Sequence, residues 1–226
     1  MAQQERAVRT RQALIRSAAA VFDSHGYAEA TLGLISAGAG VSPGALHFHF
    51  ANKAVIGAAV ERAAAGTLRD IAGQAASGRG SALQALIDAS HLLARTLASD
   101  VVMRAGLQLC REARYEPSGD LRDAWPRHVR RRLAVAADEG TLLPGLGLHR
   151  AAALIVAATT GFQVLGKDDP EWISGRSLTD FWEMALPCLA TAATVRRLEP
   201  GGTFRVGEEG PGCRGRDAVL CAGRAG

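Results

Sequence analysis

TLGLISAGAGVSPGALHFHF, residues 31–50, is the stretch that decides the fold, because its helix-start and turn signals have the spacing of two short helices. Thr31 is a good N-cap for a helix that ends near residue 39, and Gly40 then allows a tight turn. Ser42 caps the next helix, and Pro43 stands at its first position, where a missing N–H group does no harm. The stretch predicts helix, turn and helix.

Two apolar residues flank the start of the second helix and fix its angle. Val41 precedes the Ser42 cap and Leu46 is the fourth helical residue, which are the positions of a hydrophobic staple. Gly33 and Gly38 each weaken the first helix by about 1 kcal/mol relative to Ala, so packing must compensate. The pattern is that of a helix-turn-helix, whose second helix can enter the major groove of DNA.

The outward face of the second helix carries candidate DNA contacts. At 100° per residue, Leu46 and Phe50 define the core side of this helix. Gly44 and Phe48 then point nearly opposite, and His47 lies on the flank. Gly44 lets a phosphate approach the helix N-terminus, Phe48 can touch a thymine methyl group, and His47 can donate to a phosphate or a base.

Residues at the helix starts complete this candidate set. Thr31 and Lys53 begin the flanking helices and are candidates for contacts to the DNA backbone. The candidate DNA-binding residues are Thr31, Ser42, Gly44, His47, Phe48 and Lys53. An outward Phe also occurs at partner interfaces, so the spacing alone leaves a structural role open. His47 and His49 lie about 200° apart on a helix and do not fit a zinc pair, so no metal site is expected.

A longer helix is predicted to precede this stretch, from residue 6 to residue 25. Its apolar residues, which include Leu14 and Phe22, repeat at helical spacing and form one buried stripe. Gly26 can end the helix in a left-handed conformation, and Tyr27 can fold back onto Phe22, as the Schellman motif requires. With the two short helices, this makes three predicted helices at the N-terminus.

The composition favours an all-α fold. Hydrophobic residues make up 48% of the 226 residues, enough for a sizeable core, whereas aromatic residues make up only 5%. The net charge of +4 is compatible with a polyanionic partner but is too small to identify one. The longest apolar run, residues 151–162, is shorter than the ~20 residues that span a bilayer, so no membrane span is expected.

The cysteines and the N-terminus indicate a cytoplasmic protein with reduced thiols. Cys110, Cys188, Cys213 and Cys221 form no C-x-x-C pair and no zinc-like cluster with histidine. The N-terminus lacks the apolar stretch of a signal peptide. The sequence shows no nucleophile–base constellation, phosphate loop or metal spacing, so neither an enzyme nor a cofactor is expected.

The rest of the chain predicts a larger helical region and a tail. Further helices are expected at about 52–76, 81–98, 101–115, 121–139, 148–166 and 175–197. Pro126 fits only the first turn of a helix, so Asp120 or Asp123 is expected to cap there. Residues 199–226 are rich in Gly and Arg and are expected to form a disordered tail.

The N-terminal residues resemble the signature of the tetracycline-repressor (TetR) family of transcriptional regulators. The resemblance rests, in order, on Thr10-Arg11, Ala18-Ala19, Phe22, Gly26-Tyr27, Thr31, Ile35, Ala39-Gly40-Val41-Ser42, Gly44, Leu46, His49-Phe50 and Lys53. It implies a TetR-type DNA-binding domain at 8–68, with the helix-turn-helix at 31–50. A ligand-binding and dimerisation domain would then occupy 77–198, with its last two long helices paired with their copies in a four-helix dimer bundle.

More dispersed matches resemble the γ-butyrolactone autoregulator receptors within that family. These matches are residues 44–51, residues 102–107 and Trp125. The resemblance implies a homodimeric repressor that binds operator DNA and is released by a small-molecule effector, with a γ-butyrolactone as the candidate. The alternative is a pseudo-receptor, meaning a helical small-molecule-binding dimer with weak DNA binding or a different effector.

Three residues of the larger domain are candidate ligand contacts. The counterpart of Trp125 in the receptors lines the ligand pocket, although a core tryptophan is the structural alternative. Thr159 and Gln163 lie four residues apart on one face of an apolar helix, where they can hydrogen-bond a buried lactone with a hydroxyalkyl chain. A threonine hydroxyl can equally bond the carbonyl four residues back.

Two residues depart from the resemblance. The family usually has Tyr where His47 stands, and the receptor subgroup commonly has Lys where Pro43 stands. The second helix therefore has no Arg or Lys before Lys53, and it cannot bind guanine with two hydrogen bonds. DNA shape and methyl contacts must contribute more, and we expect a modest operator affinity.

Overall fold

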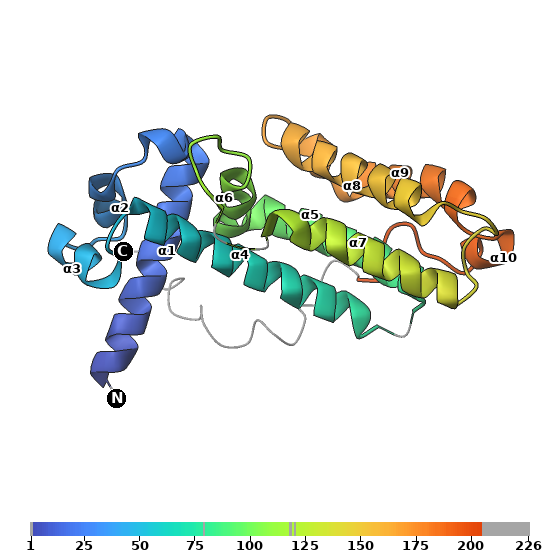
Figure 1. Ribbon diagram of the computed structural model, residues 1–226, viewed down its shortest axis with the longest axis horizontal. Helices are drawn as coiled ribbons and strands as arrows, with labels where there is room; N and C mark the ends of the chain where they lie inside the picture. The colour runs from blue at the N-terminus through green and yellow to red at the C-terminus, as the bar shows by residue number, and fades with distance from the viewer. Residues whose placement is uncertain (1, 79, 118, 120, 205–226) are drawn as a thin grey trace, which may run out of the picture.

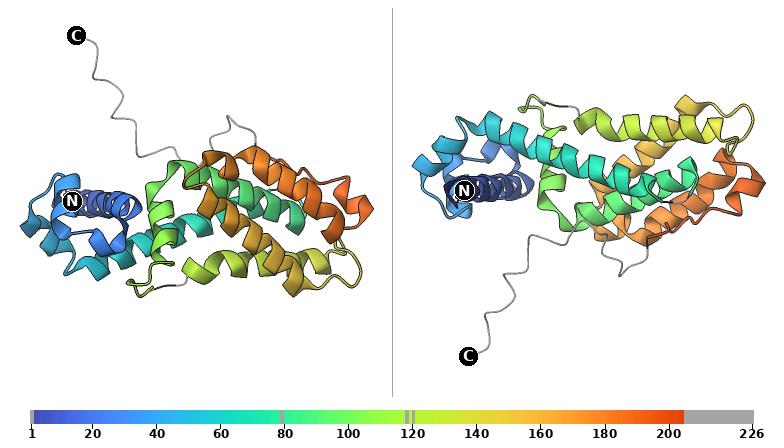
Figure 2. Two further views of the ribbon diagram at one scale, coloured as in Figure 1. Left: turned by 90° about the horizontal axis from the view of Figure 1, so that it is seen from above. Right: turned by 90° about the horizontal axis from the view of Figure 1, so that it is seen from below.

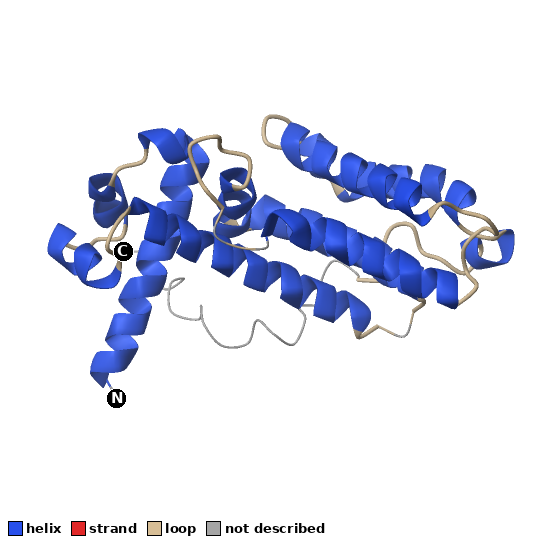
Figure 3. Cartoon of the chain, in the orientation of Figure 1, coloured by secondary structure: helices blue, strands red, loops and turns tan. Residues whose placement is uncertain are grey.

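The computed structural model describes residues 2–78, 80–117, 119 and 121–204, and its regular structure is helical (Figures 1 and 3). The helices are α1 (Ala2–Glu29), α2 (Leu32–Gly38), α3 (Pro43–His49), α4 (Lys53–Ala76), α5 (Ala82–Ser99), α6 (Val101–Leu109), α7 (Leu121–Asp138), α8 (Leu148–Leu165), the 3-10 helix η1 (Pro170–Ile173), α9 (Gly175–Leu189) and α10 (Ala192–Val195). In the described part of the chain no strand occurs, and one isolated bridge joins Leu142 to Ala190. The all-α prediction is confirmed.

Helices α1, α2 and α3 pack around a small core at one end of the molecule, which we call the head (Figure 1). Its largest buried side chains are Leu14, Phe22, Ile35, Leu46, Phe50 and Ile56. The predicted caps are formed: Leu34 N–H donates to Thr31 Oγ1, and Ala45 N–H donates to Ser42 Oγ, each at 3.2 Å. Gly40 has a φ of 65° in the turn between α2 and α3. Local signals thus fix the head.

Helix α1 differs from its prediction at both ends. It begins at Ala2 and continues to Glu29, but Gly26 interrupts it with φ 77° and ψ 164°, a conformation that favours glycine. The predicted break at Gly26 is therefore present, followed by a further helical turn. Tyr27 contacts Phe22 with ring centroids 5.5 Å apart, as expected.

Helix α4 leads from the head into the larger part, which we call the body, where α5 is buried along nearly its whole length. Helices α4, α7 and α9 all contact α5. Helices α8 and α9 form an outer layer over α5 and α7, on the far side from α4 (Figures 1 and 2). The body core contains Leu83, Leu86, Ile87, Met103, Leu133 and Trp182.

Two predicted helices end earlier than expected. Helix α6 stops at Leu109, whereas its pattern predicted residue 115. Helix α9 stops at Leu189 because Ala190 is extended and pairs with Leu142, and the short α10 follows. Tertiary pairing therefore overrides helix propensity at this point.

The expected position of Pro126 is wrong. Pro126 lies inside α7, which begins at Leu121, so Asp123 is a helical residue and not the cap. Residue 120, the other expected cap, lies outside the described residues. Pro126 cannot donate to the carbonyl of Arg122, so the helix gives up one internal hydrogen bond there.

The first residues of the predicted tail are held against α5. Glu199 N–H donates to Gln84 Oε1 at 2.8 Å, and Thr203 N–H donates to Asp88 Oδ1 at 2.8 Å. Thr203 Oγ1 donates to the other oxygen of Asp88, and a nitrogen of the His91 ring lies 2.8 Å from the carbonyl of Pro200. The body thus extends at least to residue 204, and the remainder of the expected tail, residues 205–226, lies outside the described residues.

Candidate functional site

The exposed side of α3 is the first part of the candidate site. Leu46 and Phe50 are buried in the head core, whereas Phe48 is 83% exposed. Gly44 and His47 are also exposed. The periodicity therefore placed the core side and the outward side of α3 correctly. Burial of this exposed aromatic ring against another molecule is favourable, because water is a poor solvent for apolar surface.

Lys53 does not lie free beside this surface. Its ammonium nitrogen donates to the carbonyl oxygens of Tyr27, Ala28 and Ala30, at 2.8, 3.1 and 2.9 Å. The nitrogen also lies 4.7 Å from the centre of the Tyr27 ring. All three N–H groups are used to cap the end of α1, so Lys53 locks α4 to α1 and has no free donor for a phosphate.

Arg11 places a positive charge beside α3 that sequence reasoning did not locate there. Its guanidinium lies 5.1 Å from the centre of the Phe50 ring, which caps the C-terminal end of α3, and the residue is exposed. The cation–π contact brings a charge from α1 to the end of α3. A separation of 39 positions along the chain hides this proximity from any local pattern.

Helix α6 joins the head to the body. Arg104 Nε donates to Asp23 Oδ2 of α1 at 3.0 Å, and Gln108 Nε2 donates to the Phe22 carbonyl at 3.3 Å. On its other side α6 crosses α4 so closely that a Cβ on Gly106 would lie 2.4 Å from the Cβ of Ala64. A shift of α6 must therefore move α1, α4 or both.

A buried carboxylate ties α4 to the segment between α6 and α7. Glu61 is almost fully buried; it accepts from Tyr115 Oη at 2.9 Å and from Gly119 N–H at 3.0 Å. Tyr115 also packs edge-on against Tyr27 of the head, with ring centroids 5.0 Å apart. The segment is thereby linked to both parts of the molecule.

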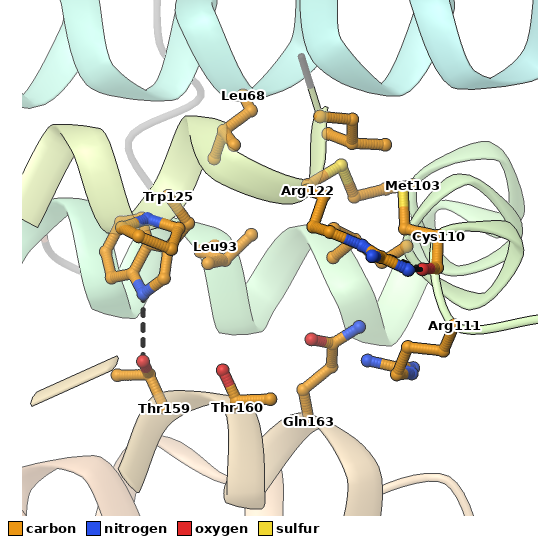
Figure 4. Close-up of a pocket in the computed structure, with 13 residues that line it drawn as sticks. Leu68, Leu93, Met103, Cys110, Arg111, Arg122, Trp125, Thr159, Thr160 and Gln163 are labelled. Atoms are coloured by element: carbon orange, nitrogen blue, oxygen red, sulfur yellow. Dashed lines mark hydrogen bonds between the residues drawn. The ribbon is translucent and has the colours of Figure 1, made fainter. Parts of the chain in front are cut away.

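The second part of the candidate site is a cavity of about 370 Å³ inside the body. Its walls come from α4, α5, α6, α7 and α8 (Figure 4). The apolar lining includes Leu68, Leu93, Met103, Leu107, Leu121 and Trp125, and the polar lining includes Arg111, Arg122, Thr159, Thr160 and Gln163. All three residues expected to contact a ligand, Trp125, Thr159 and Gln163, thus line one cavity. Its size and mostly apolar walls are typical of small-molecule sites.

Trp125 is held by a hydrogen bond across the cavity wall. Its indole Nε1 donates to Thr159 Oγ1 at 2.9 Å (Figure 4), and Thr159 in turn donates to the Ile155 carbonyl at 2.7 Å. The indole is only 7% exposed, yet it lines the cavity. Trp125 is therefore a buried residue that also forms part of the cavity wall, and the Thr159 hydroxyl bonds both its own helix and the indole.

The ring of His128 lies behind this wall. It stacks on Trp125 with centroids 5.6 Å apart, and its Nε2 is buried with no hydrogen-bond partner among the described residues. Burial, reinforced by the charges of Arg132 and Arg131, lowers the pKa of His128 from 6.5 to about 4. The wall is therefore neutral at physiological pH.

Two arginines at the cavity were not anticipated. Arg122 donates from Nε to the Cys110 carbonyl at 3.1 Å, and a second guanidinium nitrogen bonds the same oxygen. Trp125 and Arg111 lie at opposite ends of the lining side chains (Figure 4). Burial raises the pKa of the Cys110 thiol to about 11, so this sulfur is a neutral part of the lining. Arg111 lies in the turn after α6 and Arg122 in the first turn of α7, so neither belongs to a periodic pattern that could have indicated the cavity.

Comparison with known proteins identifies the chain. A family model described as "Bacterial regulatory proteins, tetR family" matches residues 14–60, from the middle of α1 to the start of α4. The chain is also 32% identical over 211 residues to the A-factor receptor protein of Streptomyces griseus, a match that covers 89% of this chain and 71% of that protein. The chain belongs to the tetR family of bacterial regulatory proteins.

Solved structures of TetR-family regulators share its fold. A γ-butyrolactone receptor described as ArpA-like is 26% identical, with a TM-score of 0.73 and coverage of 86% of this chain and 96% of that chain. CprB from Streptomyces coelicolor, solved with its operator sequence, is 30% identical, with a TM-score of 0.71 and coverage of 84% and 94%. The resemblance to the receptor subgroup is thus confirmed, and this TetR-family regulator is homologous to γ-butyrolactone receptors.

Proposed function

We propose that this TetR-family regulator is a cytoplasmic transcriptional repressor, without catalytic activity, that leaves its operator when a small molecule fills the cavity of the body. The observation that carries the proposal is the position of α6, which contacts α1 and α4 and also lines the cavity with Met103 and Leu107. A ligand that displaces α6 therefore also shifts α1 or α4, which α6 contacts. We assign DNA binding to residues 8–68 and ligand binding and dimerisation to the region from 77 to the end of the described body.

The DNA surface is proposed to centre on α3. Thr31, Ser42, Gly44, His47 and Phe48 supply its contacts, with Phe48 placed against a thymine methyl group. Arg11 replaces Lys53 as the source of positive charge, since the Lys53 ammonium caps α1. Because α3 itself carries no Arg or Lys, we expect a modest affinity with a shallow dependence on salt.

The functional unit is proposed to be a homodimer built on α8 and α9. Leu154, Val164 and Leu165 form part of an exposed apolar face on α8, and Met184 of α9 is 81% exposed. Among the described residues, α8 is the one helix that is long and apolar enough to cross a membrane. Length and composition alone do not indicate a membrane span, because a core helix of a soluble protein meets the same criteria. A second copy of the chain covers this face and places two α3 helices for a two-fold symmetric operator.

The proposed effector is a small, largely apolar molecule with hydrogen-bonding groups. Leucine side chains and the Trp125 indole surround its carbon skeleton, and Gln163 donates to one of its oxygens. Thr159, whose proton goes to the Ile155 carbonyl, accepts from a ligand hydroxyl group. A γ-butyrolactone with a hydroxyalkyl chain has this chemistry and is the first compound to test.

The experiment measures retention of DNA from upstream of the protein's own gene at several salt concentrations, with and without a γ-butyrolactone. We expect retention at low salt that the lactone abolishes. Phe48→Ala is expected to reduce specific retention at least ten-fold, and Val135→Ala, which trims an exposed valine of α7, serves as the matched control. If the wild-type protein retains no specific DNA at low salt, the repressor assignment is wrong.

Arg11→Gln tests the proposed source of charge. Loss of one phosphate contact lowers the slope of log affinity against log salt by about one. Lys53→Gln is expected to lower the melting temperature of the head, because three carbonyls of α1 lose their donor. An unchanged slope in Arg11→Gln shows that the charge comes from elsewhere.

A second candidate function is a pseudo-receptor that binds a small molecule but grips DNA weakly. Two observations favour it: α3 has no Arg or Lys, and the Lys53 ammonium group is hydrogen-bonded to carbonyl oxygens at the end of α1. Ligand binding to the pure protein, measured by calorimetry, with no specific retention of DNA, identifies this function.

A further inference from the structure

A second cavity of about 400 Å³ lies between the head and the body. Asp23 of α1 lines it from the head, while Arg104 and Gln108 of α6 and Lys167 after α8 line it from the body. The short helix η1 contributes Pro170 and Ile173. Nothing in the proposed function of the first cavity uses this space.

The lining of the second cavity is strongly cationic. Arg104, Arg111 and Lys167 face it, against the single carboxylate of Asp23. Arg104 is paired with Asp23 at 3.0 Å and also donates to the Leu97 carbonyl, whereas within the described part of the chain Lys167 donates to the neutral amide oxygen of Gln108 alone, at 3.2 Å. Burial lowers the pKa of Arg111, which means that its guanidinium is partly deprived of water. Such a lining attracts an anion, because the anion accepts hydrogen bonds from cationic groups that have lost part of their hydration.

The two cavities adjoin one another. Arg111 and Gln163 line both of them, so these two side chains form the partition. On one side of the partition lie Trp125 and the leucines of the first cavity, and on the other lie Arg104 and Lys167. An amphipathic molecule fits this arrangement, with its hydrocarbon chain on the apolar side and its charged group on the cationic side.

We propose that the second cavity binds the carboxylate group of a small amphipathic acid whose hydrocarbon chain occupies the first cavity. The inference rests on the proposed function and narrows its effector from a neutral lactone to an acid. The bound carboxylate accepts hydrogen bonds from Arg111 and Lys167 and competes with Asp23 for Arg104. Loss of the Arg104–Asp23 pair removes one polar contact between α6 and α1 and leaves the bond from Gln108 to the Phe22 carbonyl, so the ligand loosens the contact between α6 and the head.

Calorimetric titration of the full-length protein tests the site with two compounds of equal carbon number. Sodium decanoate carries the carboxylate, and γ-decanolactone is neutral. We expect decanoate to bind at least about ten-fold more tightly, because charge-assisted hydrogen bonds to a carboxylate have no equivalent in the lactone. Equal affinities, or failure of decanoate to bind at millimolar concentration, overturn the proposal.

Matched variants locate the binding group. Lys167→Gln, which changes the second cavity alone, is expected to weaken decanoate binding about ten-fold or more and to leave lactone binding unchanged. Arg111 lines both cavities, so Arg111→Gln is expected to weaken decanoate binding by a similar factor and lactone binding by less. Asp23→Asn removes the competitor and is expected to tighten decanoate binding several-fold. Arg150→Gln, an exposed arginine at the start of α8, is the control and should change neither affinity. Decanoate affinity that is indifferent to both Arg111→Gln and Lys167→Gln overturns the site, provided the variants keep the wild-type melting temperature.

The same proteins separate this site from the proposed function. If decanoate binds as expected but the wild-type protein retains no specific DNA, the anion site stands and the repressor function fails. If a lactone releases DNA while decanoate does not bind, the repressor function stands and the anion site fails.

Discussion

The head and the body of this protein carry their functional surfaces in opposite ways. In the head, α3 is an outward surface on a scaffold fixed by nearby caps, where Ser42 and Thr31 each bond an N–H three residues along. In the body, the ligand surface faces inward and draws its walls from five helices. Changes in the head should therefore act locally, whereas changes in the body should spread to the cavity and to the head through α6.

The largest effect is expected at the crossing of α6 and α4. A Cβ on Gly106 would lie 2.4 Å from that of Ala64 and 3.2 Å from Leu121 Cδ2, so Gly106→Val must push α6 away from α4. We expect the free energy of unfolding to fall by about 3 kcal/mol, as for severe overpacking. Gly73→Ala, where no atom lies within 4 Å, should instead raise it by up to about 1 kcal/mol. Urea unfolding distinguishes the two, and equal stability of both variants contradicts a tight crossing.

The second effect concerns pH and the wall behind Trp125. Below about pH 6.5 the unfolded chain protonates His128, whereas the folded protein does not until about pH 4, because its pKa is depressed. The free energy of unfolding should therefore fall as pH is lowered between these values, on the order of 2 kcal/mol after allowing for the partly exposed ring. His128→Gln should remove this part of the pH dependence in urea unfolding at pH 7 and 4.5. His149→Gln, at an exposed position, should leave the pH dependence unchanged. If the two variants show the same pH dependence, burial of His128 is not its cause.

A third prediction concerns the hydrogen bond that holds Trp125. Thr159→Val keeps the shape of the side chain but leaves the buried indole N–H without its acceptor. We expect a loss of about 1.5 kcal/mol in unfolding free energy and weaker binding of the effector, because the cavity wall loosens. Thr159→Ser restores the hydroxyl and should recover most of both. Calorimetry measures the affinity for the effector, and urea unfolding measures the stability. If Thr159→Val keeps the wild-type value of both, the hydrogen bond contributes to neither.

The smallest effect compares one cap in each region. Ser42→Ala and Ser81→Ala remove the N-caps of α3 and α5, and each should cost about 1 kcal/mol. Only Ser42→Ala should also weaken DNA retention, because α3 belongs to the proposed DNA surface whereas α5 is buried in the body. Equal losses of DNA retention in both variants would show that the two regions are not separable in this way.

Sequence reasoning was most accurate where short-range chemistry decides the outcome. The caps at Thr31 and Ser42, the turn at Gly40 and the outward position of Phe48 all follow from spacings of a few residues, and all are present. The same reasoning placed Pro126 wrongly, because helix propensity disfavours an interior proline but packing of α7 against α5 and α8 tolerates it.

The candidate ligand residues were found by two different kinds of signal. Trp125 came from a resemblance to known receptors, and Thr159 and Gln163 came from their spacing on an apolar helix. Their meeting in one cavity, and the presence of Arg111 and Arg122 beside them, could not be derived from either signal. A cavity depends on the relative placement of several helices, which no single helix encodes.

The sequence by itself determined the caps of α2 and α3 and the inward and outward faces of α3, because these depend on contacts within one or two turns of the chain. Only the tertiary structure decided that Lys53 caps α1 across 23 to 26 residues and that residues 199–204 pack against α5 across about 115. The partner of a hydrogen-bonding group far along the chain is chosen by the packing of whole helices, and periodicity carries no record of that choice.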